Sequence, residues 1–146
     1  MAQPPANTMN PDFPSAASRH LRDAKALLVT SPENAFYLAG YVAECSLKAV
    51  IVRSGAHAPA FGHQLSKLEG DGFDLAVALA PGSARYRPNA ESVTRLRSSW
   101  SESKRYESTG DTKAQQAAAT VKLAEDIYRN CVIEMFLDGI LMELPV

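Results

Sequence analysis

The sequence lacks an excess of charge of either sign. Fifteen Lys and Arg residues stand against 16 Asp and Glu residues, which leaves a formal net charge of -1 at neutral pH. A chain with this balance has no overall positive field that attracts phosphate backbones, so any nucleic-acid site has to be local. At 146 residues and 46% hydrophobic content, the chain has the size of one ordinary domain with its own core.

The sequence also lacks the marks of export and of membrane insertion. Its first residues hold no basic stretch followed by an apolar run, and charged residues interrupt each long apolar segment. We therefore expect a cytoplasmic protein without a membrane span.

Cysteine is scarce, and the spacings typical of metal and cofactor sites are missing. Cys45 and Cys131 are the two cysteines, and each lies among apolar residues, so we expect buried, reduced thiols. No Cys or carboxylate neighbours His57 or His63, and no glycine-rich phosphate loop, HExxH pair or GxSxG turn occurs. The sequence therefore predicts no metal ion and no cofactor.

Strand-like alternation and internal repeats are missing too, and the pattern that is present is helical. Residues 1–14 hold four prolines among polar residues, which predicts a disordered tail, with one domain over residues 15–146. From residue 15 apolar side chains recur at spacings of three and four, which predicts a first amphipathic helix carrying Ala17, Leu21, Ala24 and Leu28.

A second helix is predicted from about Glu33 to Arg53. Ser31, Pro32 and Glu33 are a cap residue, a first-turn proline and a first-turn acid, and Gly55 follows the last turn. Two apolar seams run along this segment, so it has neighbours on two sides and is the central helix.

Further helices are expected after the second one. Residues 63–68 and 73–80 predict short helical pieces, and Asn89 predicts the cap of a helix that places Val93, Leu96 and Trp100 on one face. Thr112 and Gln115 have the spacing of a capping box before a long last helix that runs to about residue 137. The predicted fold is all-α, an up-and-down bundle of four to five helices.

One polar stripe crosses the apolar second helix, and it is the candidate ligand site. Tyr37, Tyr41, Glu44 and Lys48 share a face, with Glu44 and Lys48 one turn apart. Two interpretations stand side by side. The stripe is either a surface-facing ion pair or a polar groove, partly covered by the loop that carries Lys104, Arg105 and Tyr106, in which cations and rings suit a phosphate and a base.

Two further residues could serve a site or the core. Trp100 lies on the apolar face of its helix, which favours a core position over a stacking platform. His63 follows a glycine at the start of a short helix, where a capping or packing role and a ligand-binding role are both open.

Several segments together resemble the HEPN domain family over residues 15–137. They are residues 19–21 (RHL), 34–41 (NAFYLAGY), 43–49 (AECSLKA), 62–65 (GHQL) and 100–106 (WSESKRY). The resemblance implies a small helical bundle that dimerises. It also implies a role as a metal-independent ribonuclease or as the partner of a minimal nucleotidyltransferase in toxin–antitoxin and defence modules.

The chain departs from that family's nuclease motif, an arginine followed a few residues later by a histidine near the last helices. Arg95 and Arg97 are present there without a histidine, and Glu102 holds one of the possible places. We therefore expect no catalytic residues and a binding module for a partner protein, such as a nucleotidyltransferase, or for nucleotide or RNA. The alternatives are a ribonuclease with a degenerate site that uses Glu102, and a purely structural interaction bundle.

A homodimer is the expected assembly. The central helix carries more apolar surface than a small bundle readily covers, and the C-terminal stretch adds an apolar cluster of Ile140, Leu141, Met142 and Leu144.

Overall fold

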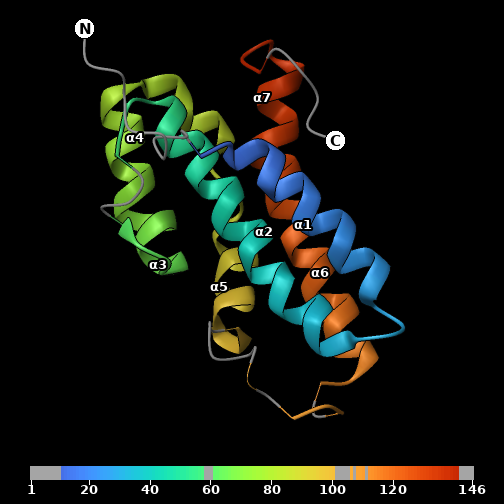
Figure 1. The fold of residues 1–146 in the computed structure, drawn as a ribbon. Coiled ribbons are helices and arrows are strands. Elements are labelled where there is room, and N and C mark those ends of the chain that lie inside the picture. Colours follow the sequence, from blue (N-terminus) through green and yellow to red (C-terminus); the bar gives the residue numbers. More distant parts are fainter. Residues whose placement is uncertain (1–10, 58–60, 101–105, 107, 111, 142–146) are drawn as a thin grey trace, which may run out of the picture.

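The computed structural model describes residues 11–57, 61–100, 106, 108–110 and 112–141, and all regular structure in these ranges is helical. Its longer helices are α1 (Phe13–Leu27), α2 (Pro32–Arg53), α5 (Ala90–Ser99) and α6 (Ala114–Tyr128). Figure 1 shows that α1, α2, α5 and α6 alternate in direction along the chain. The predicted all-α, up-and-down bundle is confirmed.

Helix α1 begins two residues earlier than the sequence pattern indicated, inside the stretch that was assigned to the tail. Asp12 is its N-cap residue, and the Asp12 carboxylate accepts a hydrogen bond of 3.1 Å from the Ser15 backbone N–H. Pro14 therefore lies in the first turn, where a missing N–H costs nothing because that N–H would have no partner within the helix. Pro14 thus marks a helix start, while residues 1–10 of the predicted tail lie outside the described residues.

Helix α2 matches its prediction at both ends. Ser31 is the N-cap residue, Pro32 and Glu33 lie in the first turn, and Gly55 adopts a φ of 100°, the left-handed region that follows many helix ends. By length and composition α2 could cross a membrane, but 78% of its most apolar stretch is buried against the rest of the fold. That burial is what a core helix shows.

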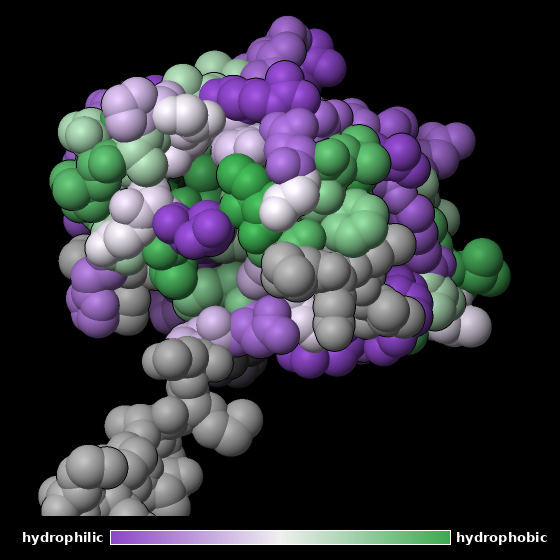
Figure 2. Space-filling view, turned by 90° about the horizontal axis from the view of Figure 1, so that it is seen from above, coloured by the Kyte–Doolittle hydropathy of each residue, from purple (hydrophilic) through white to green (hydrophobic). Residues whose placement is uncertain are grey.

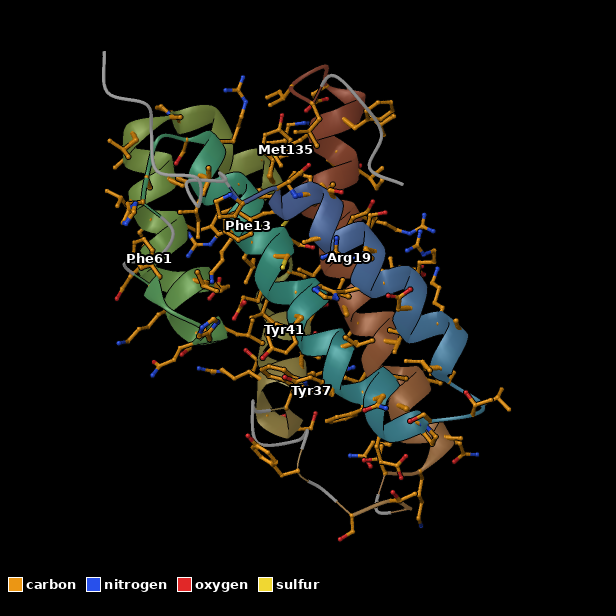
Figure 3. All side chains as sticks on the ribbon, in the orientation of Figure 1. Phe13, Arg19, Tyr37, Tyr41, Phe61 and Met135 are labelled. Carbon is orange, nitrogen blue, oxygen red and sulfur yellow. The ribbon has the colours of Figure 1, made fainter. Side chains whose placement is uncertain are left out.

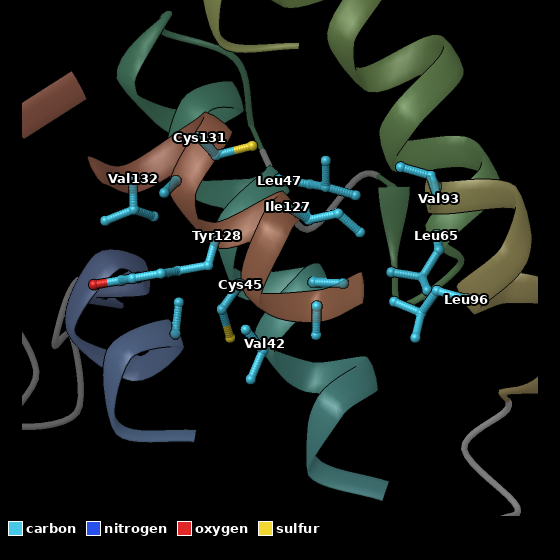
Figure 4. Packing of buried hydrophobic residues seen from close by; sticks show 14 of the residues in the cluster. Val42, Cys45, Leu47, Leu65, Val93, Leu96, Ile127, Tyr128, Cys131 and Val132 are labelled. Atoms are coloured by element: carbon cyan, nitrogen blue, oxygen red, sulfur yellow. The ribbon is translucent and has the colours of Figure 1, made fainter. Parts of the chain in front are cut away.

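The core surrounds α2, which packs against α1 on one side and α6 on the other. Figure 4 shows part of this core, in which Val42, Cys45 and Leu47 of α2 lie among side chains of α5 and α6. Phe36, Leu47 and Ile51 are each buried almost completely, so each contributes about 1.5–3 kcal/mol of transfer free energy. One chain therefore covers most of both apolar seams of the central helix, while Val52 in its last turn is 43% exposed.

The short elements between α2 and α5 form one continuous winding segment. It consists of α3 (Leu65–Lys67), a π-helical turn (Leu68–Gly72), α4 (Phe73–Leu79) and a 3-10 helix (Pro81–Tyr86). The two separate pieces predicted for residues 63–80 are joined by the π-helical turn. Asn89 caps α5 as predicted, since its side chain accepts a hydrogen bond from Glu91 N–H at 2.8 Å.

The last helix starts one residue later than a Thr112–Gln115 capping box requires. Lys113 is the N-cap residue of α6, because the first helical hydrogen bond runs from Ala117 N–H to the Lys113 carbonyl at 3.0 Å. Helix α6 continues through a π-helical turn (Arg129–Ile133) into α7 (Glu134–Leu137). Gly139, with a φ of 78°, follows the end.

Candidate functional site

The centre of the polar stripe is buried. Glu44 and Lys48 are 4% and 6% exposed, and Lys48 Nζ lies 3.5 Å from Glu44 Oε2. The ring of Phe13 from α1 lies over the ammonium group, with Nζ 5.7 Å from the ring centroid. The surface-facing ion pair, one of the two interpretations of the stripe, is therefore wrong. Removing one partner would leave a buried charge uncompensated, a change that typically costs about 3–5 kcal/mol.

His63 contacts the other oxygen of the same carboxylate. Its Nδ1 lies 2.8 Å from Glu44 Oε1, while 56% of the His63 side chain is exposed. An ionised carboxylate can only accept hydrogen bonds, so Nδ1 carries a proton, and Nε2 is the ring nitrogen that remains for a ligand. A turn at Gly62, whose φ is 59°, precedes His63. The ligand-binding alternative for His63 thus gains an oriented, accessible imidazole.

The N-terminal half of the stripe is an aromatic cluster. The Tyr37 hydroxyl donates to the Tyr41 hydroxyl at 3.0 Å, and the two ring centroids are 5.1 Å apart. Trp100 stacks on Tyr37 at 6.2 Å and meets Tyr41 edge-on at 5.5 Å. Both tyrosines are half-buried, and Figure 3 shows them one turn apart on α2. Trp100 covers one face of the Tyr37 ring, and the exposed part of each tyrosine remains available to a ligand.

Trp100 fixes the end of α5 on α2, which confirms its predicted core position. Its indole Nε1–H donates to the Tyr37 carbonyl at 2.9 Å, and 7% of the residue is exposed. Its ring lies directly over Gly40, where even a Cβ atom would collide with it. The chain therefore leaves α5 beside the polar stripe and continues into residues 101–105, which lie outside the described residues.

Helix α1 contributes His20 to the border of the cluster. The His20 ring centroid lies 6.0 Å from that of Tyr41. Burial lowers the pKa of His20, and the neighbouring Arg19 guanidinium lowers it further. At neutral pH His20 is accordingly uncharged, and Arg19, exposed on the same helix (Figure 3), is a permanent positive charge of this border.

The structure brings together most of the residues that the sequence nominated. They form two contact groups along α2, Tyr37 with Tyr41 and Glu44 with Lys48 and His63. Tyr106 is 75% exposed, and Lys104 and Arg105 lie outside the described residues. Of the degenerate nuclease residues, Arg95 pairs with Glu91 at 2.6 Å, Arg97 is exposed, and Glu102 lies outside the described residues as well.

Sequence reasoning missed Phe13, His20 and the contact of Trp100 with the stripe. A signal for Trp100 existed, because a glycine inside a long apolar helix indicates close approach of a bulky neighbour, and Gly40 is that glycine. His20 stands three residues after Ala17 and four before Ala24, both fully buried, which places it on the edge of the α1 face that packs on α2.

The thiols have no place in this site. Both cysteines are free and buried, as predicted. Burial raises the pKa of Cys45 to about 11 and also raises the pKa of Cys131, so neither forms the reactive thiolate near neutral pH. Within the described ranges, no three His, Cys, Asp or Glu side chains are grouped closely enough to hold a metal ion.

No protein-family model, curated protein or solved structure matches this chain. Its chemistry has to be inferred from the side chains themselves. They supply an oriented imidazole, two partly exposed phenol rings and a buried charge pair whose carboxylate is already neutralised by Lys48. Such a surface suits a ligand that carries both an anionic group and a flat ring.

Proposed function

We propose that this chain is a HEPN-like binding domain, silent as a ribonuclease, that holds a nucleotide or a single-stranded RNA segment against the polar stripe of α2. The observation that carries the proposal is the exposed His63 imidazole, held at 2.8 Å by the buried Glu44 carboxylate next to the stripe that bears Tyr37 and Tyr41. The HEPN resemblance is compatible with such a binding role, but the proposal rests on the geometry of the site.

Charge supports an anionic ligand at this position. Lys48 already offsets the charge of Glu44, so a proton on His63 adds a positive charge at the mouth of the site. Arg19 adds a second from α1. When both ring nitrogens carry a proton, the Nε2–H donates to a phosphate oxygen in a charge-assisted hydrogen bond, which is about twice as strong as a neutral one.

The aromatic cluster supports a base as the other half of the ligand. A nucleobase that stacks on an exposed aromatic face typically contributes about 1–3 kcal/mol, with little dependence on base identity. Tyr37 and Tyr41 are held in place by their mutual hydrogen bond and by Trp100. A ligand would therefore meet rings that are already ordered, which lowers the entropy cost of binding.

The test uses Trp100, the single tryptophan, as an intrinsic reporter because it touches both tyrosines. Tryptophan fluorescence is followed while short oligouridine RNA or a mononucleotide is added at low salt. We expect saturable quenching, and we expect His63→Ala and Tyr41→Ala each to weaken affinity by about tenfold, equivalent to about 1.4 kcal/mol. His57→Ala, which removes an exposed histidine away from the stripe, is the matched control.

In the fluorescence titration, unchanged RNA affinity in His63→Ala and Tyr41→Ala would exclude the stripe as the binding surface.

Two further experiments test the alternative functions. Incubation of RNA with the protein in chelator should leave the RNA intact, and cleavage that is lost in Glu102→Gln would establish the degenerate ribonuclease instead. Binding of a purified minimal nucleotidyltransferase in place of RNA, lost in His63→Ala, would assign the stripe to a partner protein.

A further inference from the structure

A cavity opens at the other end of the bundle, away from the polar stripe. It has a volume of about 330 Å³, within the range of small-molecule pockets. Arg53, which borders it, lies five residues beyond Lys48, the last residue of the stripe, which is roughly 7.5 Å further along the α2 axis and about 140° around it. Figure 2 looks onto this end and shows hydrophobic side chains gathered around a hollow with hydrophilic groups at its margin. The lining residues are Val50, Arg53, Ala80, Gly82, Ser83, Tyr86, Met135 and Ile140.

The wall of this cavity is mostly aliphatic. Val50 and Met135 are each 1% exposed, and Ile140 is turned back toward the core because its N–H donates to the Met135 carbonyl at 2.9 Å. Methionine adapts its shape to what it contacts, so this wall suits a flexible apolar chain better than one rigid shape.

Two polar groups of the cavity are left without partners among the described residues. Arg53 is exposed and forms no ion pair there, although it lies at the C-terminal end of α2. The Ser83 hydroxyl makes no hydrogen bond with the described residues, yet no fully buried side-chain oxygen or nitrogen there lacks a partner. The Ser83 oxygen must therefore reach the solvent of the cavity.

The other polar groups near the cavity are already occupied. The Tyr86 hydroxyl donates to Asp138 at 2.8 Å, and the neighbouring Arg85 binds Asp138 and Glu134. Arg53 thus supplies the uncompensated positive charge of this cavity within the described part of the chain. One guanidinium matches one carboxylate, which it can bind through two parallel hydrogen bonds.

We infer that this cavity binds a monoanionic amphiphile, a carboxylate with a short or medium aliphatic chain. The carboxylate pairs with Arg53 and accepts from the Ser83 hydroxyl, and the aliphatic chain lies along Val50, Met135 and Ile140. A phosphate group would bring a second negative charge for which the described residues offer no partner. The site is separate from the polar stripe and does not depend on RNA or nucleotide binding there.

The test is titration calorimetry of the full chain with octanoate and, separately, with octyltrimethylammonium, both below their micelle-forming concentrations. We expect saturable binding of octanoate, at least tenfold tighter than that of the cationic amphiphile. Arg53→Gln should weaken octanoate binding by about tenfold. Arg22→Gln, which removes an exposed arginine of α1, should leave it unchanged.

A second variant tests the apolar half of the site. Ala80→Leu adds three carbons to the cavity wall from a partly exposed position, so the bundle should still fold. We expect it to weaken the binding of octanoate at least fivefold, with an unchanged melting temperature. Equal affinity for the two amphiphiles, or octanoate binding that neither Arg53→Gln nor Ala80→Leu weakens, would overturn the assignment.

Discussion

Gly40 is the residue at which the sequence allows α5 to approach the central helix. A Cβ atom at this position would lie 1.8 Å from Trp100 Cε2, so no other residue type fits beneath the indole. Trp100 has little freedom to withdraw, because its Nε1–H is bound to the Tyr37 carbonyl and its ring packs on Tyr41. One missing side chain thereby fixes the position of the aromatic cluster.

We predict that Gly40→Ala destabilises the protein by about 2 kcal/mol, because the clash outweighs the better helix propensity of alanine. Thermal or denaturant unfolding followed by circular dichroism measures the change, and tryptophan fluorescence should shift as the indole is displaced. Gly70→Ala is the matched control, since nothing lies within 4 Å of a Cβ atom there. It should be neutral or stabilising by about 0.5 kcal/mol. Equal effects at the two positions would contradict the packing argument.

The burial of Glu44 and Lys48 was beyond the reach of sequence reasoning. Their spacing on one face of α2 was predictable from helix geometry alone. What covers them comes from distant parts of the chain, namely the Phe13 ring and the His63 imidazole. Because burial depends on such tertiary contacts, the sequence could nominate the stripe but could not tell whether its ion pair is exposed or buried.

At the scale of elements, the boundaries that were predicted correctly are those set by local chemistry. Asn89 begins α5 with a side-chain cap, and Gly139 follows α7 as a left-handed residue. Helix α2 begins at Ser31 and Pro32, where the first-turn proline is the signal because the Ser31 side chain makes no capping hydrogen bond. The π-helical turns at Leu68–Gly72 and Arg129–Ile133 have no such signature. Their residues have the pattern of ordinary helix or loop, and π-helical turns are rare, so the sequence did not predict them.

A clasp of polar side chains joins the 3-10 helix Pro81–Tyr86 to the end of α7. Arg85 Nε donates to Asp138 Oδ2 at 2.6 Å, and the Tyr86 hydroxyl donates to the same oxygen at 2.8 Å. The hydrogen bonds from Arg85 and Tyr86 hold the pKa of Asp138 below its ordinary value of 3.8. Tyr86 also lines the cavity beside Arg53, so loss of the clasp would loosen that end of the bundle.

We predict that the clasp contributes stability that disappears in acid. Since the pKa of Asp138 is lower in the folded chain than in the unfolded chain, the contribution is complete above pH 3.8 and is lost as the pH falls through the folded value. Asp138→Asn should lower the melting temperature modestly at pH 5–7, because exposed pairs are screened by solvent and salt. The difference from the unsubstituted chain should vanish in strong acid. Asp71→Asn, at an exposed aspartate outside the clasp, should show no such difference at any pH.

At the scale of the whole molecule, the apolar surface that was expected to drive dimerisation is largely covered within one chain. The single chain buries most of both seams of α2, with Val52 left exposed, and Ile140 and Leu141 pack partly against the core. Met142 and Leu144 lie outside the described residues. Among the exposed apolar side chains, Val52 of α2 and Leu137 of α7 are 43% and 67% exposed, whereas α4 presents a pair, Leu75 and Leu79, one turn apart and 41% and 54% exposed. A homodimer through α4 would cover Leu75 and Leu79 of each copy with the other copy of this chain.

We therefore predict a homodimer that forms through α4. Light scattering at tens of micromolar should give twice the 15.8 kDa mass of one chain, because the two leucines of each copy leave water on association. Leu75→Glu combined with Leu79→Glu should give the monomer mass, with helix content unchanged in circular dichroism. Val29→Glu is the matched control, since Val29 is 92% exposed in the turn between α1 and α2 and should leave the dimer intact. A monomer mass for the unsubstituted chain would refute the dimer, and a dimer that survives both leucine substitutions would place its interface away from α4.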